Sequence, residues 1–80
     1  MNVKGAVVYR IQAICAKQEL TVNALANYCG IAPTTLYSMF HARSQNIGIV
    51  SIQKICDGLG ITVREFFNDP LFDHLDSVIQ

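Results

Sequence analysis

Residues 20–40, LTVNALANYCGIAPTTLYSMF, place an alanine, a glycine and an isoleucine at fixed distances within a pattern that predicts two short helices. Two helices that cross steeply after a short turn need a small residue where they approach each other, and Ala26 occupies that position. The sharp reversal after the first helix favours a residue that accepts a positive φ angle, which Gly30 supplies. Ile31 then provides an apolar side chain for the corner. The stretch therefore predicts a helix, a tight turn and a second helix.

The segments on either side of this stretch also carry helical patterns. Apolar residues recur at steps of three and four between residues 5 and 18, which is typical of a helix with one face against a core. Thr21 is suited to cap the helix that follows it, and Pro33 suits the first position of a helix that runs to about residue 40. A fourth helical pattern ends at Gly60 and consists of Ile52, Ile55, Cys56 and Leu59.

The C-terminal quarter of the chain contains two further helix starts. Thr62 and Glu65 have the spacing of a capping box, which predicts a fifth helix. Asp69 followed by Pro70 predicts the cap and first residue of a short sixth helix within residues 69–80. The predicted fold class is all-α: a compact five-helix bundle to which a short sixth helix is added.

Composition limits the class of protein. The chain has 80 residues, of which 51% are hydrophobic and 15% charged, so it suits one compact domain and excludes a multi-domain enzyme. No apolar run approaches the roughly 18 residues of a membrane span, and residues 1–20 lack the features of a signal peptide, so we expect a cytoplasmic protein. Cys15, Cys29 and Cys56 lie within helical patterns without CxxC spacing and are predicted to be reduced core residues.

Residues 20–40 resemble the helix-turn-helix of the phage-repressor family, the Cro-like or Xre-like bacterial regulators. RIQAI at residues 10–14 and SIQKICDGLGITVREFF at residues 51–67 extend this resemblance over about residues 10–67. The resemblance implies a bundle of the phage-repressor DNA-binding type, with its motif at about residues 21–40 and the helix at about 33–41 in the major groove of double-stranded DNA. It divides the chain into a DNA-binding domain, 1–68, and a C-terminal helical extension, 69–80.

The helical wheel indicates which side chains face the groove. With Leu36, Met39 and Phe40 turned inward, an opposite face remains that consists of Thr34, Tyr37, Ser38 and His41. The hydroxyl groups of Thr34 and Ser38 suit hydrogen bonds at base edges, while Tyr37 suits a phosphate or a sugar. Thr35 and Pro33 flank this face.

The resemblance adds roles at individual positions. It implies that Pro33, Thr34 and Ser38 read bases, and that His41 and Arg43 contact phosphates. Val22 and Asn23, near the start of the preceding helix, would approach the DNA backbone. Backbone N–H groups at that helix terminus are also suited to bind a phosphate.

The charge of the chain must be consistent with binding to DNA. Six basic and six acidic residues give a formal net charge of zero, so DNA binding requires a local basic patch. Arg43 is the basic residue beside the recognition helix in the sequence, whereas Asp69, Asp73 and Asp76 gather near the C-terminus. We therefore expect the C-terminal end to face away from DNA.

The resemblance also implies a homodimer, because such domains usually bind pseudo-palindromic sites as twofold pairs. Apolar residues beyond the apparent needs of a five-helix core are the candidates for the dimer contact: Phe66, Phe67, Leu71, Phe72, Leu75 and Ile79. An alternative is that this segment folds back and completes its own core.

Two functions are consistent with these features. The first is a sequence-specific transcriptional regulator, with repression as the expected mode. The alternative is a protein-interaction module, antitoxin-like or adaptor-like, on the same scaffold without specific DNA contact. No enzyme, cofactor, metal or small-molecule substrate is predicted, because the chain lacks a nucleophile elbow or phosphate loop, and His41 and His74 lack ligands at suitable spacing.

Overall fold

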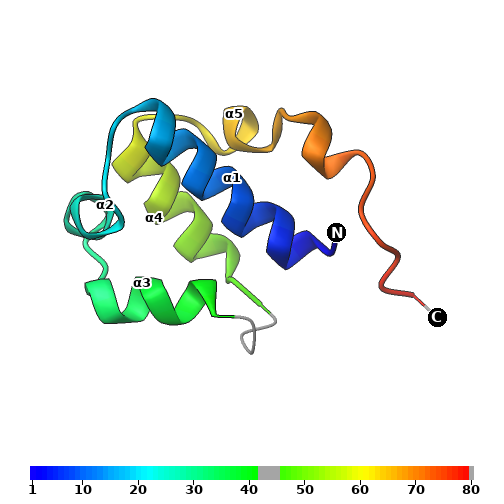
Figure 1. The fold of residues 1–80 in the computed structure, drawn as a ribbon, viewed down its shortest axis with the longest axis horizontal. Coiled ribbons are helices and arrows are strands. Elements are labelled where there is room, and N and C mark those ends of the chain that lie inside the picture. Colours follow the sequence, from blue (N-terminus) through cyan, green and yellow to red (C-terminus); the bar gives the residue numbers. More distant parts are fainter. Residues whose placement is uncertain (42–45, 80) are drawn as a thin grey trace.

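The protein is a bundle of helices, described here by a computed structural model that covers residues 1–41 and 46–79. The helices are α1 (Val3–Lys17), α2 (Val22–Cys29), α3 (Pro33–Phe40), α4 (Ile49–Leu59) and α5 (Val63–Phe67), followed by the 3-10 turn η1 (Pro70–Phe72). The prediction of an all-α fold with five helices is confirmed (Figure 1). Within the described residues, no helix has both the length and the apolar character needed to cross a membrane.

Helix ends follow the capping chemistry of the sequence. The Thr21 hydroxyl accepts a hydrogen bond from the Ala24 N–H at 3.1 Å, and Thr62 and Glu65 form both hydrogen bonds of a capping box. Gly30 and Gly60 terminate α2 and α4 in the left-handed conformation, with φ angles of 69° and 73°. These local signals explain why the predicted ends of α2 and α4 are confirmed.

Two helices begin earlier than their apolar patterns suggest. The Asn2 carboxamide oxygen accepts from the Gly5 N–H at 2.7 Å, so α1 already starts at Val3. Helix α4 starts at Ile49, one turn before its first core residue, Ile52. The apolar pattern does not show these first turns because they contribute few buried side chains to the core.

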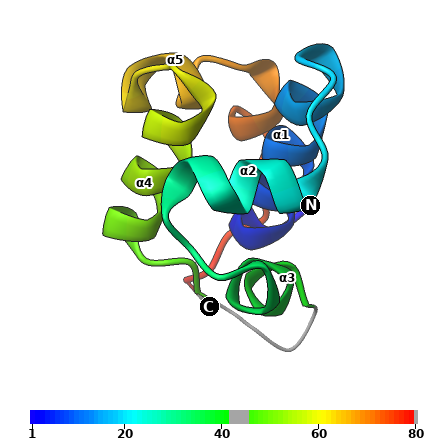
Figure 2. The same ribbon diagram turned by 90° about the vertical axis from the view of Figure 1, so that its left-hand side faces the viewer.

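The core receives side chains from all five helices. Its largest fully buried side chains are Phe66, Ile11, Leu25, Leu36, Ile55 and Cys56. Helices α2 and α3 cross steeply, since each is seen lengthwise in the view that shows the other end-on (Figures 1 and 2). Ala26 is fully buried at the centre of this arrangement, in agreement with the need for a small residue.

All three cysteines are free thiols, as predicted. Cys15 and Cys56 are buried, while Cys29 is half-buried at the end of α2. Helix α4 passes so close to Cys29 that a Cβ atom placed on Gly58 would lie 2.6 Å from the Cys29 Sγ atom and 3.2 Å from its backbone nitrogen. The absence of a side chain at Gly58 therefore permits the contact between α2 and α4.

The predicted sixth helix is limited to one turn. Asp69 caps η1 by accepting from the Leu71 N–H at 2.9 Å, as expected, but residues 73–79 continue without a helix. Beyond η1, Leu75 is half-buried and Val78 and Ile79 are exposed, so core packing does not support a longer helix. Instead the segment passes the N-terminus of the chain (Figure 1), where the Asp76 N–H donates to the Met1 carbonyl at 3.1 Å.

Aromatic side chains of the C-terminal segment fill the core of the same chain. Phe66 is fully buried, and Phe67 and Phe72 are half-buried against the core. The ring of Phe67 lies 5.0 Å from that of Phe66 and 4.9 Å from that of Phe72, both edge to face. The alternative in which the segment folds back thus accounts for these three residues, whereas Val78 and Ile79 remain exposed.

Candidate nucleic-acid interface

Helix α3 presents a polar face to solvent. Leu36 is 0% exposed, and Met39 and Phe40 are half-buried, which is the inward set that the helical wheel predicts. Pro33, Thr34, Thr35, Tyr37 and Ser38 are all exposed, and His41 is exposed at the C-cap. The structure thus brings the predicted groove-facing side chains together on one accessible side of the molecule, at the lower edge in Figure 1.

The Ser38 hydroxyl already has a partner within α3. It donates a hydrogen bond to the Thr34 carbonyl at 2.9 Å. Its oxygen can still accept a hydrogen bond, for example from the amino group of adenine or cytosine in the major groove. In this rotamer Ser38 therefore offers an acceptor, and not its hydroxyl proton, to an outside partner.

Three helix starts differ in how many backbone N–H groups they leave for a phosphate. In α2, Val22 is half-buried and Asn23 is exposed, and the Thr21 side chain occupies the Ala24 N–H. Ala32 and Gly48, which precede α3 and α4, have no side-chain acceptor with which to cap their helices. Pro33 itself has no N–H group, so the first turn of α3 leaves as many donors for an anionic partner as that of α2, and only the first turn of α4 leaves more.

The basic residues near α3 differ from the sequence-based expectation. Arg43, the predicted phosphate contact, lies outside the residues that the structure describes. Lys4 was missed, yet its ammonium group donates a hydrogen bond to the carbonyl of His41 at the end of α3. These two residues are 37 positions apart, and Lys4 precedes the helix-turn-helix, so no local pattern in the sequence signals their contact.

The titratable groups give no indication of catalytic chemistry. Within residues 1–41 and 46–79, no group of three or more His, Cys, Asp or Glu side chains is placed to hold a metal ion. Burial, with a smaller contribution in the same direction from the neighbouring Cys15, Cys56 and Asp57, raises the pKa of the Cys29 thiol to about 11. Burial also raises the pKa values of Cys15 and Cys56, which keeps these thiols protonated and unreactive at neutral pH.

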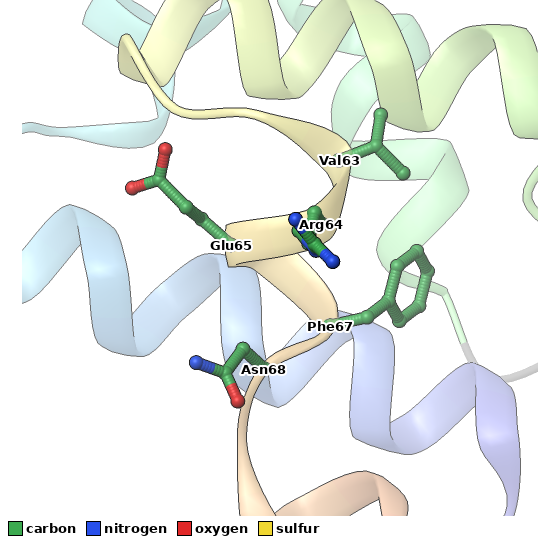
Figure 3. A pocket seen from close by; sticks show the side chains of 5 residues that line it. All are labelled: Val63, Arg64, Glu65, Phe67 and Asn68. Carbon is green, nitrogen blue, oxygen red and sulfur yellow. The ribbon is translucent and has the colours of Figure 1, made fainter.

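A surface hollow of about 540 Å³ lies on α5 and not on α3. It is lined by Val63, Arg64, Glu65, Phe67 and Asn68. Val63 and Phe67 extend to one side of the helix, and Glu65 and Asn68 to the other (Figure 3). These polar groups do not converge on one point, as they would around a small-molecule ligand. The hollow therefore does not compete with α3 as the functional site.

Comparisons with known proteins agree with this geometry. A family model described as a Cro/C1-type HTH DNA-binding domain matches residues 10–70. The crystal structure of the prophage Lp1 protein 11 is 33% identical, with a TM-score of 0.80 over 94% of this chain and 100% of that one. The wild-type restriction-modification controller protein C.Esp1396I is 24% identical, with a TM-score of 0.74 over 88% of this chain and 87% of that one. A search of curated proteins finds no match.

Proposed function

Because this chain belongs to the family of Cro/C1-type helix-turn-helix DNA-binding domains, we propose that it is a sequence-specific transcriptional regulator whose α3 enters the major groove. Membership of this family makes it a DNA-binding domain and not an enzyme. The observation that carries the proposal is the polar face of α3, where Thr34, Tyr37 and Ser38 are exposed opposite the buried Leu36. A cytoplasmic location is part of the same proposal.

We assign base recognition to the first half of α3. Pro33, Thr34 and Ser38 are proposed to meet base edges, with Thr35 at the border of this set. The Thr34 methyl group suits contact with a thymine methyl group, and the Ser38 oxygen suits a base amino group. Their exposure supports this assignment.

Contacts to the DNA backbone are proposed for a second set of residues. Tyr37 and His41 lie along the outer side and at the end of α3, where phosphates and sugars border the groove. Arg43 is assigned to a phosphate from its position in the sequence alone. Val22 and Asn23 are proposed to approach the backbone from the start of α2. Phosphate contacts of this kind set the orientation of α3 without reading the base sequence.

Repression is the proposed mode of regulation, because a domain that occupies an operator blocks other proteins without needing a further activity. We also propose a homodimer on a pseudo-palindromic site, with the two α3 helices about 34 Å apart. Few basic residues mean few phosphate contacts per subunit, so two subunits are needed for tight binding. Val78 and Ile79 are the exposed apolar residues of the C-terminal segment that remain for such a contact. Light scattering at micromolar concentration tests this part, and a strictly monomeric mass contradicts it.

The test of the regulator is selection of duplexes from a random pool at low salt, followed by binding measurements with the selected duplex and a scrambled one. Ser38→Ala should weaken binding to the selected duplex by about fivefold or more and leave binding to the scrambled duplex nearly unchanged. Tyr9→Phe, which removes an exposed hydroxyl from α1, is the control and should change neither affinity.

Salt dependence tests the backbone contacts separately. Arg43→Ala should weaken binding to all duplexes and reduce the slope of log K against log salt by about one unit. Arg64→Ala, on α5, removes the same charge on the opposite side of the molecule and should leave the slope unchanged. If the wild-type protein enriches no duplex from the pool, the protein-interaction module is the better description.

A further inference from the structure

Helix α3 is anchored differently at its two ends. Its first residues follow a rigid turn, since Gly30 is left-handed and Ile31 is buried in the corner. Leu36 is the only residue of α3 that is fully buried. Met39 and Phe40, near the C-terminal end, are half-buried. The side chains that hold the C-terminal end in place are therefore important for the direction in which α3 projects.

Lys4 is the charged side chain that reaches this end. Its ammonium group donates to the carbonyl of His41, the C-cap residue of α3. The last carbonyl groups of a helix have no N–H partner within it, and a cation placed there is also favoured by the helix dipole. One contact therefore places a donor at the C-terminal end of α3 and joins it to the first turn of α1.

The stem of Lys4 is fixed as well. Lys4 is half-buried and lines a small hollow of about 140 Å³ whose other walls include Val7, Ile47 and Ile52. Packing of the methylene groups against apolar neighbours restricts the rotamers of the side chain and so directs its ammonium group. By contrast, Lys17, Lys54 and Arg64 are exposed on α1, α4 and α5.

We propose that Lys4 is a positioning residue for DNA recognition: it fixes the C-terminal end of α3 against α1 and thereby sets how Tyr37 and His41 meet the DNA. This inference rests on the proposed role of α3 as the recognition helix. Because the ammonium group is committed to a protein carbonyl, Lys4 acts through α3 and not as a phosphate contact. Its loss reduces discrimination between duplexes more than it reduces electrostatic attraction.

The experiment compares Lys4→Met, which keeps the apolar stem and removes the donor, with Lys4→Arg, which keeps a cationic donor. Lys17→Met, at the far end of α1, removes the same charge and is the matched control. Lys4→Met should reduce the preference for the selected over the scrambled duplex by about tenfold. The slope of log K against log salt should be the same for Lys4→Met as for Lys17→Met. Lys4→Arg should restore most of that preference.

Hydrogen exchange provides a readout that does not depend on DNA. In Lys4→Met the amides at the C-terminal end of α3 should exchange several-fold faster, whereas those of α1 and α4 keep their wild-type rates. Equal exchange at the end of α3 in both proteins overturns the proposed anchor, even if the variant is as stable as the wild type.

Two binding outcomes also contradict the inference. A Lys4→Met variant with an unchanged preference shows that Lys4 does not position α3, while the proposed regulator stands. A uniform loss on both duplexes with a salt slope reduced by about one unit makes Lys4 a phosphate contact instead. If the wild-type protein itself prefers no duplex, the proposed function fails, and the role of Lys4 in recognition fails with it.

Discussion

Gly58 is the residue at which α4 comes closest to α2. A Cβ atom there would lie 2.6 Å from the Cys29 Sγ atom and 3.3 Å from the backbone carbonyl carbon of Tyr28. Since the backbone of α2 cannot move aside without disturbing the core, we expect Gly58→Ala to reduce the free energy of unfolding by about 1–3 kcal/mol. Urea denaturation followed by circular dichroism measures this change.

Gly48→Ala is the control for Gly58→Ala. A Cβ atom at Gly48 meets no other atom within 4 Å, and the φ angle of −61° suits any residue. Its effect should stay within about 0.5 kcal/mol, which is the loss expected from a weaker N-cap. Equal stability of the two variants would mean that α2 and α4 have room for a methyl group between them.

Cys29 predicts a pH dependence of stability. Its pKa is raised from 9.0 to about 11 in the folded protein, mainly by burial, so the folded state favours the neutral thiol. The unfolded chain loses this proton first as the pH rises, which lowers the free energy of unfolding between about pH 9 and pH 11. Below pH 9 the full contribution is present. Chemical denaturation across this pH range should show that the free energy of unfolding declines less steeply with pH in Cys29→Ala than in the wild type.

Single residues differ in how well the sequence predicts them. Ala26, Gly30 and Ile31 were predicted correctly because their roles depend on neighbours a few positions away. Gly58 and Lys4 were not, because each acts on a residue that is distant along the chain. The exposure of the α3 face follows from the helical period, but DNA contact by its side chains stays a prediction.

At the scale of elements, helix boundaries that carry a local capping signal were predicted better than those marked by apolar periodicity alone. A left-handed glycine terminates α2 and α4, and such residues are visible in the sequence. The starts of α1 and α4 lie one turn outside the apolar pattern, so periodicity alone does not show them. The sixth helix was overestimated, since the Asp69–Pro70 signal begins a turn, but the apolar residues beyond it do not pack into the core and so do not support a longer helix.

Arg10 joins three elements. Its guanidinium group donates to the Phe66 carbonyl at 2.8 Å, to the Glu65 carbonyl at 3.0 Å and to the Asp69 carboxylate at 3.3 Å. Arg10→Met removes all three bonds and leaves partly buried acceptors without a donor, so we expect a loss of about 1–3 kcal/mol in urea denaturation. The stability of Arg10→Lys should lie between those of the wild type and Arg10→Met, because an ammonium group cannot reproduce the planar donor geometry of a guanidinium group.

The ion pair alone should matter less than the whole set. Asp69→Asn keeps the oxygen that caps η1 and removes the charge, and the two side chains of the pair are 20% and 34% exposed. Its cost should therefore stay below about 1 kcal/mol. An Asp69→Asn effect as large as that of Arg10→Met would assign the stabilisation to the charge and not to the backbone carbonyls.

At the scale of the molecule, the boundary predicted at residue 68 can be tested by truncation. Phe72 packs beside Phe67, and Asp69 pairs with Arg10, so residues beyond 68 contribute to the packing of the bundle. A chain that ends at Asn68 should lose about 2 kcal/mol of stability through the exposed aromatic surface. Thermal and urea denaturation measure the loss. Unchanged stability would support a separate extension that is available for a partner.

The bonds between Arg10 and residues 65–69 have a consequence for how the protein is made. The first helix emerges from the ribosome long before the acceptors that it needs have been synthesised. Until then α5 is not present to pack against the apolar face of α1. The chain segment between Arg10 and residues 65–66, which these hydrogen bonds close into a loop, makes up most of the sequence. Assembly of the complete bundle therefore awaits the synthesis of residues 65–69, and until then α1 has only part of its final packing.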